Sequence, residues 1–556
     1  MFTFSQSGTT RPWATKRRMS LLAAGFAIIP TKLKGCLLIS KRSRRQTREP
    51  TTVVRQRPRR YNCAIHPPGP RRSANRPDYS TGRSLMSAEL AFMSAVELAE
   101  NIRQKKVSSL EATENFFERI HRLDPQLHSY LTLCQDQALA DARAADDAAQ
   151  RGGGLGPLHG VPISIKDLEL TKGVTTTMGS AVFRDRTPDM DSIVVERVKA
   201  SGAIILGKTN TPEFGQSGTT ENKLGEPCRN PWNTERTPGG SSGGAAAALA
   251  AGLCTVSMGT DGGGSIRIPA SFSGVYGIKP TQGRVPRYGG YGRPSANHFS
   301  QSGPITRTVA DSALLLQVVA GPDTRDVTSL RQPAPDFSAG LEAGVKGMRL
   351  AWSSDYGYAA VDPEVVEITK KAALLFGEMG ATVEDSGLKM EDPFDAFWDI
   401  FATAAYTSYG HMLDEHRDDF SDYGLKSIEH GRTRTGADMS RAIYEVDRIG
   451  RRMEEFFDDF DLLLTPTMAV PAFPIEQRPS VIGGKTVQPF WGFLPFTYPI
   501  NMTGQTAASI PCGYSSDGMP IGLHIIGPRG SEAKVLQASA AFEQAMPWEG
   551  SRPGVS

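Results

Sequence analysis

Residues 238–271, PGGSSGGAAAALAAGLCTVSMGTDGGGSIRIPAS, form the stretch around which the rest of the chain is organised. It holds two glycine-flanked serine sites, at residues 239–244 and 261–265, on either side of a small-residue run. Glycine at this density costs backbone entropy, so a folded protein needs a reason for it. Bare backbone N–H groups that face a ligand are one reason, and an oxyanion stabiliser needs them. Two turns packed beside a small-residue helix would explain the glycines equally well.

Length and composition indicate a globular protein with a large core. The chain has 556 residues, enough for several domains or for one large α/β unit. No run of about 18 apolar residues occurs, so we expect no membrane-spanning helix. The six cysteines are scattered and none forms CxxC, which argues against a disulfide framework or a zinc site and favours a reducing, cytoplasmic location.

Charge is distributed unevenly along the chain. The first 80 residues carry 18 Lys and Arg against two acids, so the remainder has a net charge of −13. A mildly acidic body is not a nucleic-acid binder by its bulk charge. Residues 1–85 therefore form a basic extension without apolar periodicity. A signal peptide, an organelle transit peptide and a translation start at Met86 or Met93 remain alternative interpretations, and the composition break favours the last.

From Ser94 onwards, helical and strand patterns alternate. Ser94 and Ser108 each precede a Glu by three residues, as in a capping box. Strands alternating with helices predict an α/β fold with a largely covered sheet. The expected helices are 95–105, 109–122, 135–150, 190–201, 308–319, 363–378, 391–414, 436–458 and 531–545, and the expected strands are 160–167, 203–206, 348–353, 381–384, 461–465, 506–511 and 520–526.

Several segments match familiar motifs, but the residues around them do not fit the structure that each motif needs. Residues 202–209 match the P-loop letters, but the four middle residues read as a buried strand instead of an anion-cradling loop. Residues 239–243 fit G-x-S-x-G, but a loop-like segment precedes them where a nucleophile elbow needs a strand. Ser531 to Lys534 fits S-x-x-K, although Ser531 reads better as the N-cap of an exposed helix. The nine histidines show no metal-binding spacing, so we expect no metal and no cofactor.

Three residues are candidate catalytic residues because of the motifs in which they lie, namely Lys166, Ser241 and Ser265. The chain resembles the amidase signature family over roughly residues 94–545. The resemblance is carried by GVPISIKD around Lys166, PGGSSGGAAAALAAG around Ser241, GTDGGGSIRIPASFSGVYGIKPT around Ser265, and GPITRTVAD at 303–311. It implies one large α/β/α domain over residues 86–550, built around a mixed, twisted central sheet. A lysine at the end of a buried strand would otherwise be read as a snorkelling surface residue.

The resemblance also implies a Ser-cisSer-Lys triad. Ser265 would attack the amide carbonyl, Ser241 would relay protons next to a cis peptide bond, and Lys166 would be a neutral terminal base. The backbone N–H groups of Gly262, Gly263, Gly264 and Ser265 would bind the oxyanion. A second set of residues would brace the loop or simply pack within it, namely Ser242, Thr260, Asp261 and Arg267.

Substrate identity stays open between a small-molecule amidase and two alternatives. The aromatic residues Phe394, Phe397, Trp398, Phe401, Tyr406 and Tyr409, together with Phe490, Trp491, Phe493, Phe496 and Tyr498, predict the walls of an apolar pocket, or plain core. An apolar pocket favours amidohydrolysis of small, including aryl, amides or carbamates, since free glutamine would need a polar pocket. The glutaminase subunit of a tRNA-dependent amidotransferase and an inactive binding protein are the alternatives. We expect no nucleic-acid or membrane partner, and a homodimer is left open.

Overall fold

The computed structural model describes residues 88–289, 299–548 and 550–556. The expected basic extension, residues 1–85, lies outside this part, as does residue 86, at which the expected domain begins. From residue 88 onwards the described residues belong to one compact unit. Within the described part, no helix combines the length and the apolar character that crossing a membrane would require.

A mixed eleven-stranded sheet forms the centre of the described part, in the order β1-β3-β2-β4-β6-β5-β12-β13-β9-β7-β8. Two parallel groups, β3-β2-β4 and β9-β7-β8, flank antiparallel strands. The strands are β1 (Tyr130–Leu133), β2 (Pro162–Lys166), β3 (Ile204–Thr209), β4 (Val256–Asp261), β5 (Tyr276–Lys279), β6 (Gln301–Thr306), β7 (Arg349–Trp352), β8 (Thr382–Asp385), β9 (Leu462–Pro466), β12 (Thr506–Tyr514) and β13 (Pro520–Gly527), beside a separate hairpin of β10 (Val481–Ile482) and β11 (Lys485–Thr486).

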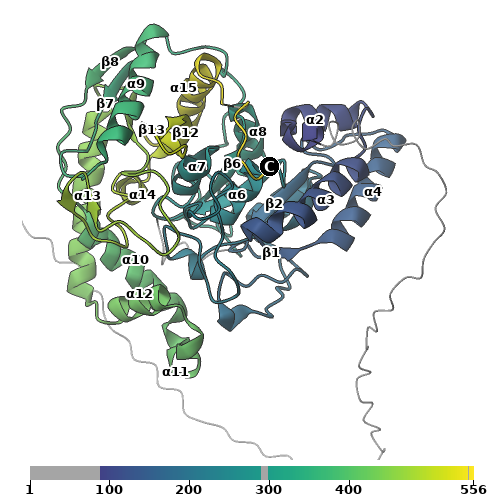
Figure 1. The fold of residues 1–556 in the computed structure, drawn as a ribbon, viewed down its shortest axis with the longest axis horizontal. Coiled ribbons are helices and arrows are strands. Elements are labelled where there is room, and N and C mark those ends of the chain that lie inside the picture. The colour runs from purple at the N-terminus through teal and green to yellow at the C-terminus, as the bar shows by residue number, and fades with distance from the viewer. Residues whose placement is uncertain (1–87, 290–298, 549) are drawn as a thin grey trace, which may run out of the picture. The chain divides into compact units, whose positions relative to one another are not determined.

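Helices cover both faces of the sheet, as the α/β/α prediction requires (Figure 1). One hydrophobic core packs α2, α5, α8, α9 and α15 against one face of the sheet. On the opposite face, a second core contains α3, α4, α6 and α7, and a third contains α10, α13 and α14. The helices are α2 (Ala95–Arg103), α3 (Ser109–Leu127), α4 (Gln135–Arg151), α5 (Ile193–Ala200), α6 (Gly243–Ala250), α7 (Arg267–Ser273), α8 (Val309–Val319), α9 (Pro363–Glu378), α10 (Phe394–Tyr409), α11 (Leu413–His416), α12 (Asp422–Arg432), α13 (Gly436–Phe456), α14 (Tyr498–Thr503) and α15 (Glu532–Ala545).

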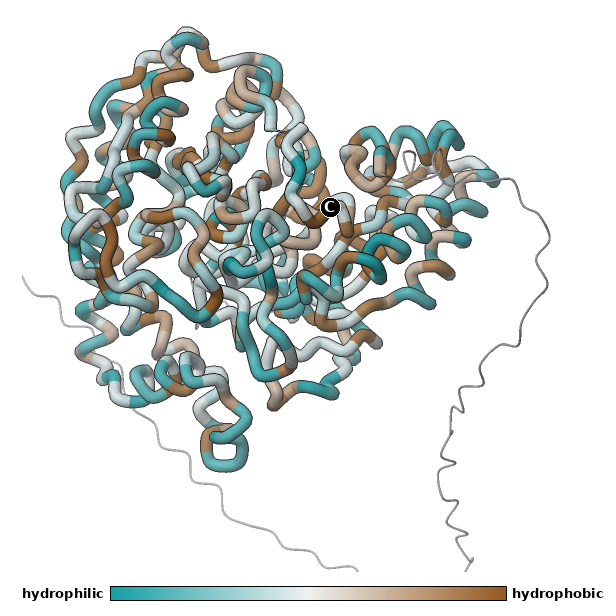
Figure 2. Tube along the Cα trace, viewed as in Figure 1, coloured by the Kyte–Doolittle hydropathy of each residue, from teal (hydrophilic) through white to brown (hydrophobic). Residues whose placement is uncertain are grey.

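Local sequence signals explain many of these boundaries. Ser94 and Glu97 form the complete capping box that starts α2, whereas Ser108 accepts a hydrogen bond from the backbone of Glu111 without the reciprocal bond. Figure 2 shows hydrophilic and hydrophobic residues alternating along α3 and α4, the pattern of helices with one buried face. The small-residue helix α6 is buried throughout, and at Gly244 a Cβ would collide with the backbone of Asn210.

Some expected elements differ from those observed. The helix expected over 391–414 begins at Phe394 and stops at Tyr409, where the chain tightens into a 3₁₀ turn (Gly410–Met412) before α11. Ser531 does start α15, but its hydroxyl donates to the Pro528 carbonyl instead of capping the helix. The helix is also half-buried and not exposed. Strands β1, β4, β5 and β6, the hairpin of β10 and β11, and helices α7, α12 and α14 are not among the expected elements.

Candidate active site

Lys166 occupies the last position of β2, and its side chain is fully buried. Successive residues of a strand point to opposite faces, so Lys166 lies on the face opposite Ile163 and Ile165, which pack into the core. β2 runs parallel to β4, with Ile165 opposite Met258. The lysine therefore lies beside the end of β4, at the edge of the sheet from which both strands exit. It is not the snorkelling surface residue that its position alone would suggest.

Oxygen atoms surround the Lys166 ammonium position. Its Nζ lies 2.7 Å from Ser241 Oγ, 2.8 Å from Ser242 Oγ, and 2.9 and 3.4 Å from Thr260 Oγ1 and O. No described carboxylate forms an ion pair with it. Ser242 Oγ donates to the Thr260 carbonyl over 3.2 Å, so this hydroxyl accepts a hydrogen bond from the lysine and does not donate one to it.

Burial lowers the pKa of Lys166 well below its usual value, because a charged ammonium loses its hydration in the interior. The negative charges of Asp261 and Glu169 oppose this shift without abolishing it. The neutral amine has two N–H donors and one lone pair. With the donors used on Ser242 and Thr260, the lone pair can accept the proton of the Ser241 hydroxyl.

Ser241 and Ser242 lie in the loop that leads into α6. The peptide bond between Gly240 and Ser241 is cis, as the family resemblance implies. The preceding segment, residues 230–240, contains no strand longer than isolated bridges, so the nucleophile-elbow interpretation fails. The Ser242 N–H donates to the Ser265 carbonyl over 3.1 Å, which holds this loop against the second serine site.

Ser265 lies between β4 and α7 and is 8% exposed, the most accessible of the three expected triad residues. Its hydroxyl forms no hydrogen bond with another residue that the structure describes. Ser241 is 1% exposed and Lys166 is completely enclosed. The three side chains thus form a gradient from the accessible Ser265 to the buried amine.

The glycines before Ser265 contribute unequally to an anion site. The Gly264 N–H donates to Asp261 Oδ1 over 2.8 Å, so it does not serve as the oxyanion donor expected from the sequence. Within the described residues, the N–H groups of Gly262, Gly263 and Ser265 have no hydrogen-bond partner. Gly264 has a φ of 126°, a conformation closed to most other residues.

A buried ion pair fixes the shape of this glycine loop. Arg267 Nε and Nη2 each lie 2.9 Å from a carboxylate oxygen of Asp261, and both side chains are fully buried. The carboxylate also accepts the N–H groups of Gly264 and Ile266, at 2.8 and 3.2 Å. Asp261 and Arg267 therefore brace the loop, and Thr260 and Ser242 contact the lysine directly.

The charge of Asp261 is secured by its partners. Burial alone would raise the pKa of this carboxyl, but the adjacent Arg267 guanidinium, together with Lys279 and the hydrogen bond from Asn501, holds it below its usual value. Arg267 Nη1 also donates to His524 Nε2 over 3.0 Å, and burial lowers the pKa of that imidazole well below its usual value, so it accepts as a neutral ring. Lys279 lies near this network, and burial lowers its pKa to about 7.

Two residues of the brace were missed by sequence reasoning. Asn501, in α14, accepts from Arg267 over 2.6 Å and donates to Asp261 Oδ1 over 2.8 Å. Thr497 donates from Oγ1 to the Gly263 carbonyl over 2.7 Å. They lie more than 230 residues beyond the loop that they hold, and no local motif marks them.

Aromatic side chains pack directly on the glycine loop. A Cβ on Gly263 would lie 3.0 Å from the Phe397 ring and 3.7 Å from Trp491, and one on Gly262 would lie 3.7 Å from Phe401. The ring centroid of Trp491 lies 5.4 Å from that of Phe397 and 5.7 Å from that of Phe401. We call Phe397, Phe401 and Trp491, with the adjoining Phe394, Trp398 and Tyr498, the aromatic wall.

The remaining aromatic residues of the expected pocket lie elsewhere. Tyr409 stacks on Phe214, and Tyr406 is 37% exposed. Phe493 packs edge-on to Phe473, and Phe496 packs against Tyr356. Phe490 packs edge-on to Trp491, and the Arg478 guanidinium lies over the Phe490 ring.

The residues that match the P-loop letters form the buried strand β3, as their context predicted. Lys208, the lysine of the P-loop letters, is buried in β3 and donates to the Thr171 and Thr176 hydroxyls at 3.0 and 3.1 Å. Histidine, cysteine and acidic side chains form no group of three or more that could hold a metal ion in the described part.

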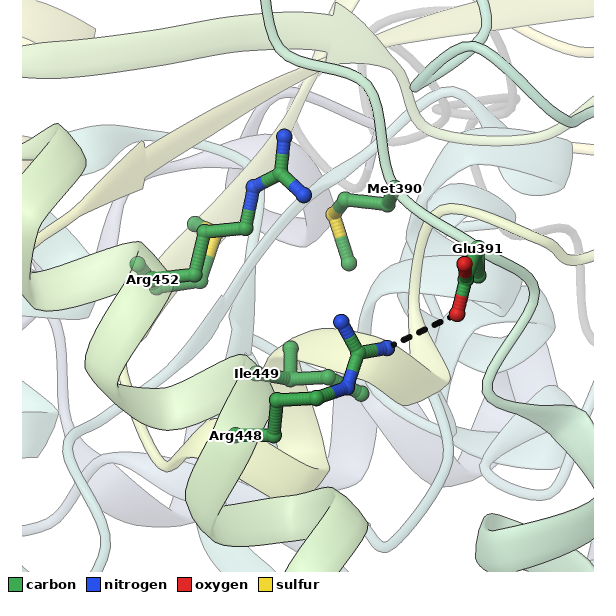
Figure 3. A pocket seen from close by; sticks show the side chains of 6 residues that line it. Met390, Glu391, Arg448, Ile449 and Arg452 are labelled. Carbon is green, nitrogen blue, oxygen red and sulfur yellow. Dashed lines mark hydrogen bonds and ion pairs between the residues drawn. The ribbon is translucent and has the colours of Figure 1, made fainter. Parts of the chain in front are cut away.

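Two pockets on the described part lie away from the triad. One is a small pocket between the segment before α10 and α13, where Arg448 faces Glu391 across 3.3 Å (Figure 3). A larger groove runs between α4 and β3 and includes His159 and Lys172. Neither is lined by Lys166, Ser241 or Ser265.

The chain is similar to known proteins over most of its length. The family model Amidase matches residues 111–536. A glutamyl-tRNA(Gln) amidotransferase subunit of Moorella thermoacetica is 40% identical over 497 residues, covering 84% of this chain and 99% of that protein. An acylamidase of Rhodococcus erythropolis is 36% identical over 470 residues, covering 84% and 98%. The crystal structure of a bacterial aryl acylamidase has a TM-score of 0.78 at 36% identity, covering 83% and 99%.

Proposed function

This chain belongs to the amidase signature family, and we propose that it is an amidohydrolase that cleaves the C–N bond of small-molecule linear amides, aryl amides or carbamates. One observation carries the proposal. Lys166 is completely buried, its hydrogen-bond partners among the described residues are hydroxyl and carbonyl oxygens, and the shortest of these bonds is to Ser241 at 2.7 Å. A neutral lysine in that position is a base that can act at ordinary pH.

Ser265 is the nucleophile in this proposal. A serine hydroxyl is a weak nucleophile unless a nearby base removes its proton. The Ser265 hydroxyl, which forms no hydrogen bond with another described residue, turns toward Ser241 Oγ and passes its proton there while the Ser241 proton passes to Lys166 Nζ. The Ser265 oxygen then bonds to the amide carbon, giving a tetrahedral intermediate with a negatively charged oxygen.

The unpartnered N–H groups of Gly262, Gly263 and Ser265 are the donors for that oxygen. Preorganised donors stabilise the intermediate because they need no reorientation as charge develops, and loss of one typically costs about 3–4 kcal/mol. Asp261 and Arg267 keep the loop in this shape. The Gly264 N–H has no part in it, because it is already bonded to Asp261.

Ser241 then donates a proton to the leaving nitrogen, and Lys166 returns its proton to Ser241. The C–N bond breaks, the amine leaves, and an acyl group remains on Ser265. Water attacks that ester through the same relay and releases the acid. No step calls for a cofactor or a metal ion.

The aromatic wall supports the substrate class. Phe397 and Trp491 touch the glycine loop, so a group attached to the carbonyl carbon meets apolar rings. Aromatic surfaces favour apolar and aryl groups over the charged ends of free glutamine. Among the similar proteins, one solved structure is named an aryl acylamidase and one relative an acylamidase.

A second candidate is the glutaminase subunit of a tRNA-dependent amidotransferase. The 40% identity to an amidotransferase subunit over 84% of this chain favours it. The purified chain should be tested on primary amides, anilides, carbamates and glutamine. Hydrolysis of anilides or carbamates by the chain alone supports the amidohydrolase, and glutaminase activity that appears only with added partner subunits overturns it.

A further inference from the structure

The 3₁₀ turn Glu213–Gly215 has an unusual backbone. Phe214 has φ 52° and ψ 17°, in the left-handed region, and Gly215 follows with φ 70°. A bulky residue rarely adopts this conformation, because its Cβ approaches the carbonyl oxygen of its own peptide unit. Such a residue persists where its surroundings determine it, often at functional sites. The turn therefore calls for an account of what holds it and what it touches.

Aromatic packing holds Phe214 in place. Its ring is completely buried and stacks on Tyr409, with centroids 3.7 Å apart and planes 10° from parallel. Phe183 and Phe420 approach it at 5.9 Å. The Phe214 N–H donates to the Met178 carbonyl over 2.8 Å. Both the ring and the backbone of Phe214 are thus fixed from several sides.

Glu213 ties the same turn to α12. Its carboxylate accepts from Ser180 Oγ over 2.7 Å and from the N–H and hydroxyl of Ser421 at 2.7 and 2.6 Å. Ser421 is the residue that caps α12. The Glu213 N–H donates to the Tyr423 hydroxyl over 2.6 Å. These bonds join the turn to its neighbours.

Gly215 meets the expected proton relay. A Cβ on Gly215 would lie 3.2 Å from Ser241 Oγ and 2.8 Å from a methyl carbon of Leu168. The bare α-carbon of Gly215 therefore closes one side of the space around the Ser241 hydroxyl, with Lys166 Nζ 2.7 Å from that oxygen. A displacement of the turn would change the position of Ser241.

One helix reaches both parts of the site. Phe397, in the first turn of α10, packs on Gly263 of the glycine loop, and Tyr409, the last residue of α10, stacks on Phe214. We propose that Phe214 is a positioning residue for Ser241, and that α10, through Tyr409 and Phe214, keeps the proton relay in register with the aromatic wall. This inference rests on the proposed function, because it assigns Ser241 to proton transfer.

The chemistry of the leaving group separates positioning from general packing. An amide nitrogen must be protonated as the C–N bond breaks, and Ser241 supplies that proton. The phenolate of a 4-nitrophenyl ester leaves without protonation. A misplaced Ser241 should therefore slow amide hydrolysis more than ester hydrolysis, whereas a loss of folded enzyme slows both by the same factor. Misplacement of a catalytic group by about 1 Å can cost on the order of 100-fold in rate.

The test compares kcat/KM for an anilide and for the matching 4-nitrophenyl ester in wild type, Phe214→Leu, Tyr409→Leu and Gly215→Ala. Phe376→Leu is the control, since Phe376 is equally buried but packs on Phe542 in a different core. We expect the amide-to-ester ratio to fall at least about tenfold in the three turn variants and to stay at the wild-type value in the control.

Equal losses on both substrates in the turn variants would overturn the inference while leaving the proposed function intact. Thermal unfolding of each variant identifies any that fail to fold, and Gly215→Ala, which leaves both rings in place, keeps the test decisive in that case. A folded wild-type protein that hydrolyses neither substrate would overturn the proposed function and the inference together.

Discussion

Lys166 Nζ and Ser241 Oγ lie 2.7 Å apart, joined across the end of β2 and the loop before α6, and both are almost entirely enclosed. The surrounding contacts of the amine are oxygen atoms of Ser242 and Thr260. An ammonium ion would incur a large desolvation cost there, so the site favours the neutral base. The proposed relay depends on this pair.

Substitution Lys166→Ala should remove most activity and weaken the rise of activity with pH. Only the neutral amine accepts a proton, so wild-type activity increases as pH rises through the lowered pKa of Lys166. The measurement is kcat/KM across a pH series for both proteins. A variant with the wild-type pH profile would remove Lys166 from the mechanism.

The same lysine should make stability depend on pH. Its pKa is lower in the folded than in the unfolded protein, so the unfolded state binds more protons, and the free energy of unfolding rises as pH increases toward 10.5. Lys166→Met should lack this increment. Chemical denaturation at several pH values measures the free energy of unfolding of both proteins. If this free energy changed with pH in the same way in wild type and Lys166→Met, the result would contradict the lowered pKa of Lys166.

Much of this arrangement follows from sequence patterns. The apolar alternation before Lys166 predicts a buried strand, and the strand in the structure covers Pro162–Lys166. The orientation of a single N–H group cannot be predicted from the sequence, because it depends on where a nearby side chain points. The Gly264 N–H, for example, donates to the Asp261 carboxylate. Asn501 could not be identified either, since it meets Asp261 across 240 residues of sequence.

Helix boundaries show the same division between local and distant causes. The capping box at Ser94 is a local signal and is present as expected. At the end of α10, Gly410 follows Tyr409 and is a residue typical of helix ends, and Tyr409 also stacks on Phe214, almost 200 residues earlier in the chain. The stacking could not be predicted from the sequence, because it joins residues that are distant in the chain.

Substitution Asp261→Asn should destabilise the protein and lower its activity. It leaves the Arg267 guanidinium buried without its counter-charge, a change that typically costs about 3–5 kcal/mol. Thermal unfolding and anilide hydrolysis measure the two effects. Asp191→Asn is a suitable control, because its ion pair with Lys199 is partly exposed. Equal effects of the two substitutions would contradict the role of the buried pair.

Trp491→Ala should reduce kcat/KM for benzamide, which carries its aryl group on the carbonyl carbon, more than for a small amide such as acetamide. The substitution removes the ring that packs beside Gly263 and Phe397, so a large aryl group loses contacts that a methyl group never makes. We expect a difference of about tenfold, which corresponds to about 1.4 kcal/mol of contact energy. Similar losses on both substrates would show that Trp491 serves only the packing of the loop.

Exhaustive dialysis against EDTA should leave activity unchanged. The proposed mechanism uses a lysine, two serines and backbone N–H groups, and the lysine and the two serines carry every proton to the leaving nitrogen or from the attacking water. Activity before and after dialysis, with and without added Zn²⁺ or Mg²⁺, tests this expectation. Activity that is lost with EDTA and restored by a metal ion would require a different mechanism.

The assignment of the nucleophile is the central claim. Treating the protein with a fluorophosphonate probe and mapping the adduct by peptide mass spectrometry tests it most directly, with Ser265→Ala as the control. We predict one adduct, on Ser265, and no labelling and no turnover in the folded Ser265→Ala protein. An adduct on Ser241, or amide hydrolysis near the wild-type rate by Ser265→Ala, would contradict the account.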